Sequence, residues 1–269
     1  MNALGGVELV IAFGFWYALG LTRMWGRVGV GRLVSRTRLR MFVSGLVVTA
    51  VALGPPLDTH VDSNLPLHMT QHVLLMWIAA PLLIAGSPMP TLVWALPASW
   101  RMATQRRWRR VHRSVASSAW PAWVAGAVVL QAVTLAVWHI PRFYEAAISN
   151  GAIHVAEHAS FLLSSMVLWW TVAGAVQRMR FGAGVLAVFV AKLPGLVLGV
   201  GMTLDAHIWY RSYGTDVAAL HDQQLAGVIM WVGGGMIATV AALVLFWLWM
   251  QALERNAPNP PVAIPELAT

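Results

Sequence analysis

The sequence contains no cysteine, a single lysine (Lys192) and few charges of either sign. Only 10% of its 269 residues are charged, against about 25% in an ordinary soluble domain. The absence of cysteine excludes a disulfide scaffold, a thiolate metal site and a haem attached through a C-x-x-C-H motif. The shortage of charge excludes a soluble single-core enzyme and a disordered chain. With 58% apolar residues, the composition predicts a polytopic membrane protein.

Seven apolar runs of about 20 residues follow one another along the chain, and a helix of that length crosses the ~30 Å hydrocarbon core of a bilayer. We therefore expect an all-α fold in which residues 1–255 form one domain of seven transmembrane helices. Residues 256–269 are rich in proline and are expected to form a disordered cytoplasmic tail. The predicted spans are Val7–Trp25, Met41–Leu57, Leu67–Gly86, Ala119–Trp138, Gly151–Gly174, Gly184–Leu204 and Leu225–Met250.

Arginine gathers on one side of these spans and predicts their orientation. Fifteen arginines lie in alternate connections and after the last span, whereas the other side has only Arg142 and Arg211. The positive-inside rule then places the N-terminus outside and the C-terminus in the cytoplasm. The net charge of +8 therefore indicates orientation and contact with the lipid bilayer, and we expect no nucleic-acid partner. The fifteen are Arg23, Arg27, Arg32, Arg36, Arg38, Arg40, Arg101, Arg106, Arg107, Arg109, Arg110, Arg113, Arg178, Arg180 and Arg255.

Eight of the nine histidines fall on or just below the predicted outer side. His68 and His72 have i, i+4 spacing, and His154 and His158 repeat it, so each pair projects from one face of a helix. Such a pair can supply two ligands to one metal ion, as zinc-binding helices do. Two pairs at the same depth favour a metal site over histidines that only pack. The expected ligands are His68, His72, His139, His154, His158 and His221, with Met69, Met76, Glu157, Asp222 and Lys192 as further candidates.

The ligand types favour copper and leave other metals open. Imidazole suits copper, zinc, iron and nickel, and the thioethers of Met69 and Met76 add a preference for Cu(I). Zinc and a non-covalent haem remain alternatives. His154, Glu157 and His158 match the H-x-x-E-H pattern, in which a glutamate acts as general base on zinc-bound water, so a zinc-dependent membrane hydrolase is a second interpretation.

Two other polar residues in or near the predicted spans have two interpretations each. Lys192 lies near the middle of a span, where it either lines the path of a metal permease or forms a buried ion pair, with Glu157 the nearest acid in depth. Asp222 opens the predicted last span, where it either caps the helix or contributes to the metal site.

Three segments resemble the multi-span, CtaG-type cytochrome c oxidase assembly factors. They are LHMTQHVLLM with the following APLLIAGSP (Leu67–Met76 and Ala80–Pro88), WHIPRFYEAA (Trp138–Ala147) leading into His154 and His158, and DQQLAGVIMW (Asp222–Trp231). The resemblance implies a bacterial plasma-membrane protein that supports copper insertion into a haem–copper oxidase and is not itself an enzyme. Oxidase subunits or a copper chaperone would be its partners. The resemblance extends to His68, His72, His139, His154, His158 and Asp222, which lie in these segments or follow directly.

Overall fold

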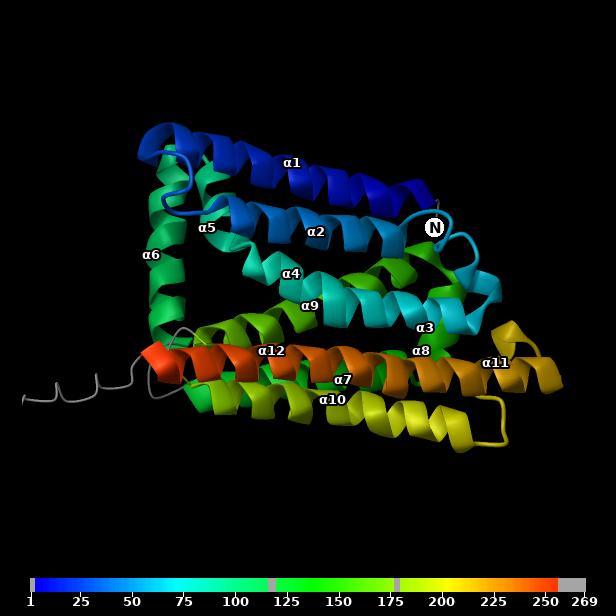
Figure 1. The fold of residues 1–269 in the computed structure, drawn as a ribbon. Helices are drawn as coiled ribbons and strands as arrows, with labels where there is room; N and C mark the ends of the chain where they lie inside the picture. The colour runs from blue at the N-terminus through cyan, green and yellow to red at the C-terminus, as the bar shows by residue number, and fades with distance from the viewer. Residues whose placement is uncertain (1–2, 116–119, 177–179, 256–269) are drawn as a thin grey trace, which may run out of the picture.

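The computed structural model describes residues 3–115, 120–176 and 180–255. The predicted disordered tail, residues 256–269, lies outside the described residues, as does Ala119. The described residues form helices joined by loops, which confirms the all-α expectation. Most of the long helices run side by side as a bundle, and α6 lies across one end of it (Figure 1).

The helices of the described residues include two short 3₁₀ turns (η1 and η3) and two π-helical segments (η2 and η4). In chain order they are α1 (Ala3–Val28), α2 (Arg36–Leu53), η1 (Val61–Ser63), α3 (Leu65–Val73), η2 (Leu74–Ala79), α4 (Ala80–Ala85), α5 (Pro88–Ala95), α6 (Ala98–Val115), α7 (Trp120–Trp138), α8 (Pro141–Ser149), α9 (Gly151–Val176), α10 (Phe181–Leu204), η3 (Arg211–Tyr213), α11 (Val217–Val228), η4 (Ile229–Gly233) and α12 (Gly234–Arg255).

Six helical stretches in the described part of the chain are long and apolar enough to cross a membrane. The predicted run Met41–Leu57 is helical only as far as Leu53, and α2, which contains its helical part, is not one of them. The hydroxyl of Ser35 caps α2 by accepting from the Arg38 amide, so the helix begins early and includes three arginines near its start. The six stretches are Gly6–Val28, Leu65–Ala85, Trp120–Trp138, Gly151–Gly174, Phe181–Leu204 and Val217–Arg255.

The last of these stretches begins eight residues before the predicted span. The Asp216 side chain accepts a hydrogen bond of 2.9 Å from the Ala219 amide and caps α11. Asp222 therefore lies within the helix, and the interpretation of Asp222 as its N-cap is wrong. The face of α11 that packs inward carries Ala219, Gln223 and Ala226.

The two ends of the bundle differ in chemistry. Residues 23–40, which include the end of α1 and the start of α2, lie with α6 at one end, here called the arginine end (Figure 1). These two segments together carry twelve of the arginines. The starts of α3 and α9 lie with α8 at the opposite end, here called the histidine end (Figure 1). The charge segregation that the sequence predicts is therefore present along the length of the bundle.

Helices α10 and α11 approach closely through glycine. A Cβ atom on Gly227 would lie 2.5 Å from the Gly199 carbonyl oxygen and 2.8 Å from the Thr203 amide nitrogen. Both of these atoms belong to the backbone and cannot rotate away. The contact holds the histidine-end half of the last long helix against its neighbour.

Gly227→Ala should therefore lower the stability of the purified protein by about 1–3 kcal/mol, the usual range for overpacking. Thermal unfolding in detergent would measure it. Gly235→Ala is the matched control, because no described atom lies within 4 Å of its Cβ position. Equal melting temperatures for the two variants would contradict the close approach.

Candidate metal centre

Two helix starts bring the histidine pairs to the same depth. Asn64 caps α3 by accepting from the Leu67 amide at 2.9 Å. Asn150 accepts from the Ala152 amide at 2.9 Å at the start of α9. Each cap fixes its helix start, so both pairs fall within the first two turns. His139 follows the last residue of α7 at the same end.

The two pairs face each other in the interior. The ring centroids of His68 and His72 are 4.6 Å apart, and those of His154 and His158 are 4.3 Å apart. Between the helices, His68 lies 5.1 Å from His154 and His72 lies 5.2 Å from His158. All four are buried, as is His139, whose ring is 5.8 Å from that of His72.

Glu157, on α9, lies against both histidines of α3. It is fully buried, with Oε2 at 3.7 Å from the Nε2 of His68 and Oε1 at 3.5 Å from the Nε2 of His72. One ligand atom from each of four residues lies within 4.8 Å of the other three. We call these four residues, with His72, the metal centre: His68, His72, His154, Glu157 and His158.

The donors of the metal centre fit a bound cation. Within the described residues, neither carboxylate oxygen of Glu157 makes a hydrogen bond, and neither do the two ring nitrogens of His72 or those of His158. Each buried polar atom left in this state costs about 1–3 kcal/mol, so such a cluster normally binds an ion or ordered water. Imidazole nitrogens and one carboxylate oxygen are ligands for copper or zinc.

Three tyrosines surround the metal centre, and sequence reasoning missed them as site residues. The hydroxyl of Tyr144 is 2.9 Å from the Nδ1 of His68, and that of Tyr213 is 3.0 Å from the same atom. Tyr210 donates to the His139 carbonyl oxygen at 3.1 Å. The pKa of Tyr210 is raised well above its ordinary value, mainly by burial and also by the nearby charge of Glu157. Its hydroxyl therefore remains a neutral donor.

The contacts of Tyr144 and Tyr213 orient the imidazole of His68. A hydrogen bond to one ring nitrogen fixes the tautomer and leaves the other nitrogen to a metal. His139 has such a bond, since its Nδ1 lies 2.9 Å from the Leu135 carbonyl oxygen. Tyr144 lies within the WHIPRFYEAA segment, so the sequence contained a signal for it. Tyr210 precedes η3 and Tyr213 is its last residue, and neither follows a pattern that could have identified it.

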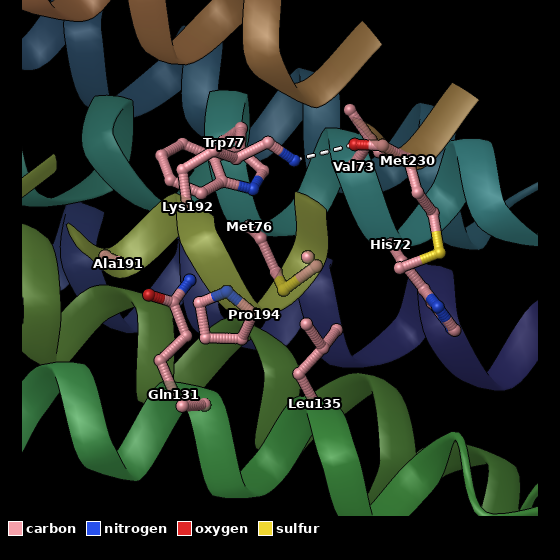
Figure 2. Close-up of a pocket in the computed structure, with 12 residues that line it drawn as sticks. His72, Val73, Met76, Trp77, Gln131, Leu135, Ala191, Lys192, Pro194 and Met230 are labelled. Carbon is pink, nitrogen blue, oxygen red and sulfur yellow. Dashed lines mark hydrogen bonds between the residues drawn. The ribbon is translucent and has the colours of Figure 1, made fainter. Parts of the chain in front are cut away.

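The remaining candidates lie elsewhere. The structure does not bring His221 to the metal centre, because it is exposed and does not lie on the inward face of α11. Asp222 is half-buried next to it. Met69 is buried in the apolar core beside the centre. Met76 lies one turn beyond His72 and lines a small pocket with it (Figure 2).

Lys192 lines the same pocket, which has a cavity of about 20 Å³, room for about one water molecule. Its Nζ donates to the Met230 carbonyl oxygen at 2.7 Å and lies 5.5 Å from the ring centroid of Trp77 (Figure 2). The polar partner that the structure shows for Lys192 is thus a carbonyl rather than Glu157, the acid that the sequence placed nearest in depth.

Comparison with known proteins adds one finding. Searches of the curated proteins and of the solved structures return no match. A family model described as cytochrome c oxidase caa3 assembly factor matches residues 15–252. That range includes the metal centre, the three tyrosines and Lys192. Because the match covers most of the chain, the protein belongs to the cytochrome c oxidase caa3 assembly factor family.

Proposed function

We propose that this protein supports cytochrome c oxidase assembly by holding a copper ion in the metal centre and passing it on. The observation that carries the proposal is the group of four buried residues whose ligand atoms lie within 4.8 Å of one another. The family's oxidase is a copper enzyme, and imidazole with carboxylate binds copper without thiolate. A thiolate-free site in the first turns of its helices suits reversible binding and release to an oxidase subunit or a copper chaperone.

The membrane arrangement belongs to the same proposal. Helix α2 lies beside α1 in the bundle (Figure 1), and we count it as a seventh span. The arginine end would face the cytoplasm, and the histidine end would face outward from the bacterial plasma membrane. The metal centre would then lie just below the outer surface, where copper could be exchanged.

Two alternatives have less support. A hydrolase would need Glu157 to reach a bound substrate, but this side chain is fully buried and lines neither the pocket at His72 nor the larger pocket at His158. A permease would need ligands along its path, but the described residues contain one group of clustered metal-binding side chains, at the histidine end. The first observation argues against a hydrolase and the second against a permease, and we therefore prefer the assembly factor.

Metal analysis of the purified protein tests the proposal. We expect about one copper per chain after loading, and loss of the ion to a chelator should lower thermal stability. Binding at 100 times the dissociation constant adds about 2.7 kcal/mol, equivalent to about 5–10 °C in melting temperature for a chain of this size. Stoichiometric zinc in place of copper would support the hydrolase. Protein that holds no metal under oxidising or reducing conditions would overturn the proposal.

A further inference from the structure

A π-helical segment directly follows the histidine pair of α3. In η2 the Ala80 amide donates to the Leu75 carbonyl oxygen, five residues earlier. In a regular α-helix it would donate to Met76, four residues earlier. Pro81 explains the distortion, because it has no amide and its ring would clash with the carbonyl of Trp77 in an α-helix.

The carbonyl bypassed by this π-turn has a substitute donor. The Nε1 of Trp169, on α9, donates to the Met76 carbonyl oxygen at 3.1 Å. Trp169 is buried, so this indole supplies the hydrogen bond that the Ala80 amide would otherwise supply. The π-turn is therefore stabilised from outside its own helix.

The last long helix repeats the arrangement. In η4 the Gly234 amide donates to the Ile229 carbonyl oxygen, five residues earlier. It also donates to the Trp231 carbonyl oxygen. The bypassed carbonyl belongs to Met230, and Lys192 on α10 donates to it at 2.7 Å (Figure 2). A Cβ at position 234 would lie 2.5 Å from the Nζ of Lys192, so Gly234 leaves room for the ammonium group beside this carbonyl.

The π-turn in η2 determines which way the histidines of α3 face. One inserted residue rotates the helix on one side of it by about 100° relative to the other side. On the C-terminal side of the turn, α4 is held by close packing against α2, since a Cβ on Gly45 of α2 would lie 2.9 Å from the Leu83 amide nitrogen. On the N-terminal side of the turn are His68 and His72 of α3. Closing the π-turn to a regular α-turn would therefore rotate the pair away from Glu157.

The π-turn in η4 positions the tyrosines in a similar way. Gln223, on α11 above the turn, accepts from the Trp209 amide at 2.6 Å and donates to the His207 carbonyl oxygen at 2.9 Å. Those two bonds hold the loop that contains Tyr210 and Tyr213, the residues that reach His139 and His68. A change in the rotation of α11 would thus move the tyrosines.

We infer that Trp169 and Lys192 are positioning residues of the metal centre: each replaces the amide bond lost in a π-turn and thereby fixes the rotation of a helix that supplies or supports the ligands. This inference rests on the proposed metal-binding function. Neither residue belongs to the metal centre. Groups outside the ligands that orient them typically change metal affinity 10–100-fold, so the effect is measurable.

The test uses Trp169→Phe and Lys192→Met, which remove the donors and keep most of the apolar volume. Trp170→Phe and Leu193→Met are the matched controls, because Trp170 packs against Trp108 near the arginine end and Leu193 is largely exposed. Copper alone is titrated into each purified protein, and X-ray absorption counts the imidazole ligands per copper. We expect a dissociation constant about tenfold or more above wild type and fewer imidazole ligands in both test variants.

The outcomes separate positioning from simple structural support. A lower melting temperature with unchanged copper affinity and spectrum in the folded protein would overturn the inference, and so would the loss of both test variants from the membrane. Reduced affinity with an altered spectrum in even one test variant, while its control behaves as wild type, would support it. Wild-type protein that fails to bind copper would instead refute the proposed function, so the two failures are distinguishable.

Discussion

Replacing His68 and His72 together with alanine should abolish copper binding and oxidase maturation while the protein remains in the membrane. The pair supplies the α3 side of the metal centre, with both Nε2 atoms 3.5–3.7 Å from the Glu157 carboxylate. Loss of a group that only orients a ligand costs 10–100-fold in affinity, so loss of two direct ligands should exceed about 100-fold. Copper per folded chain and oxidase activity of the membranes are the two measurements.

The matched control is His207→Ala with His221→Ala. It also removes two histidines near the same end of the bundle, but both are exposed and lie outside the metal centre. We expect wild-type copper content from this variant. Equal copper content in the two double variants would show that the metal centre is misplaced, and loss of copper in the control would return His221 to the ligand set.

Glu157→Gln should have opposite effects on metal binding and on the stability of the metal-free protein. The Glu157 carboxylate is the anionic group that lies against His68 and His72. Without it, the charge of a bound copper ion would be buried without its partner, which costs about 3–5 kcal/mol. That energy corresponds to a loss of more than about 100-fold in copper affinity. Without metal, however, neither carboxylate oxygen makes a hydrogen bond to a described residue. An amide of the same shape is easier to bury than a carboxylate. The metal-free variant should therefore unfold at the same temperature as wild type or higher.

Copper titration and thermal unfolding of the metal-free protein measure the two effects. Glu145→Gln is the control, because this carboxylate accepts from the Arg211 amide at 2.8 Å outside the metal centre. Unchanged copper affinity in Glu157→Gln would contradict the ligand role. A variant that keeps its copper but loses a hydrolytic activity of the wild type would favour the general-base interpretation of Glu157.

The sequence alone predicted the four histidines that lie in the metal centre because helical periodicity is local. Residues four apart on a helix share a face whatever surrounds them, so the pairs His68/His72 and His154/His158 follow from spacing. The common depth of the pairs followed from counting residues from the predicted helix ends. Glu157 appeared among the candidates because it adjoins His158, but its contact with the opposite pair depends on how α3 and α9 pack.

The misassigned residues show where local patterns fail. Asp222 and Asp216 are both reasonable caps for a helix that starts nearby, and the hydrogen bond from the Ala219 amide decides for Asp216. That choice extends the helix by two turns, with Ala219 and Gln223 on the inward face, while His221 is exposed. Similarly, the acid nearest to Lys192 in depth was Glu157, but the π-turn in the last helix offered the Met230 carbonyl instead.

The sequence by itself determined that this is an all-helical chain with opposite ends rich in arginine and in histidine, because hydropathy, charge and i, i+4 spacing act along one helix at a time. Only the tertiary structure decided that the two histidine pairs face each other, that Glu157 lies between them, and that Tyr144, Tyr210 and Tyr213 surround them. It also decided the two π-turns and their donors, Trp169 and Lys192. Those features depend on the rotation of each helix about its axis, which packing between helices fixes and local sequence does not.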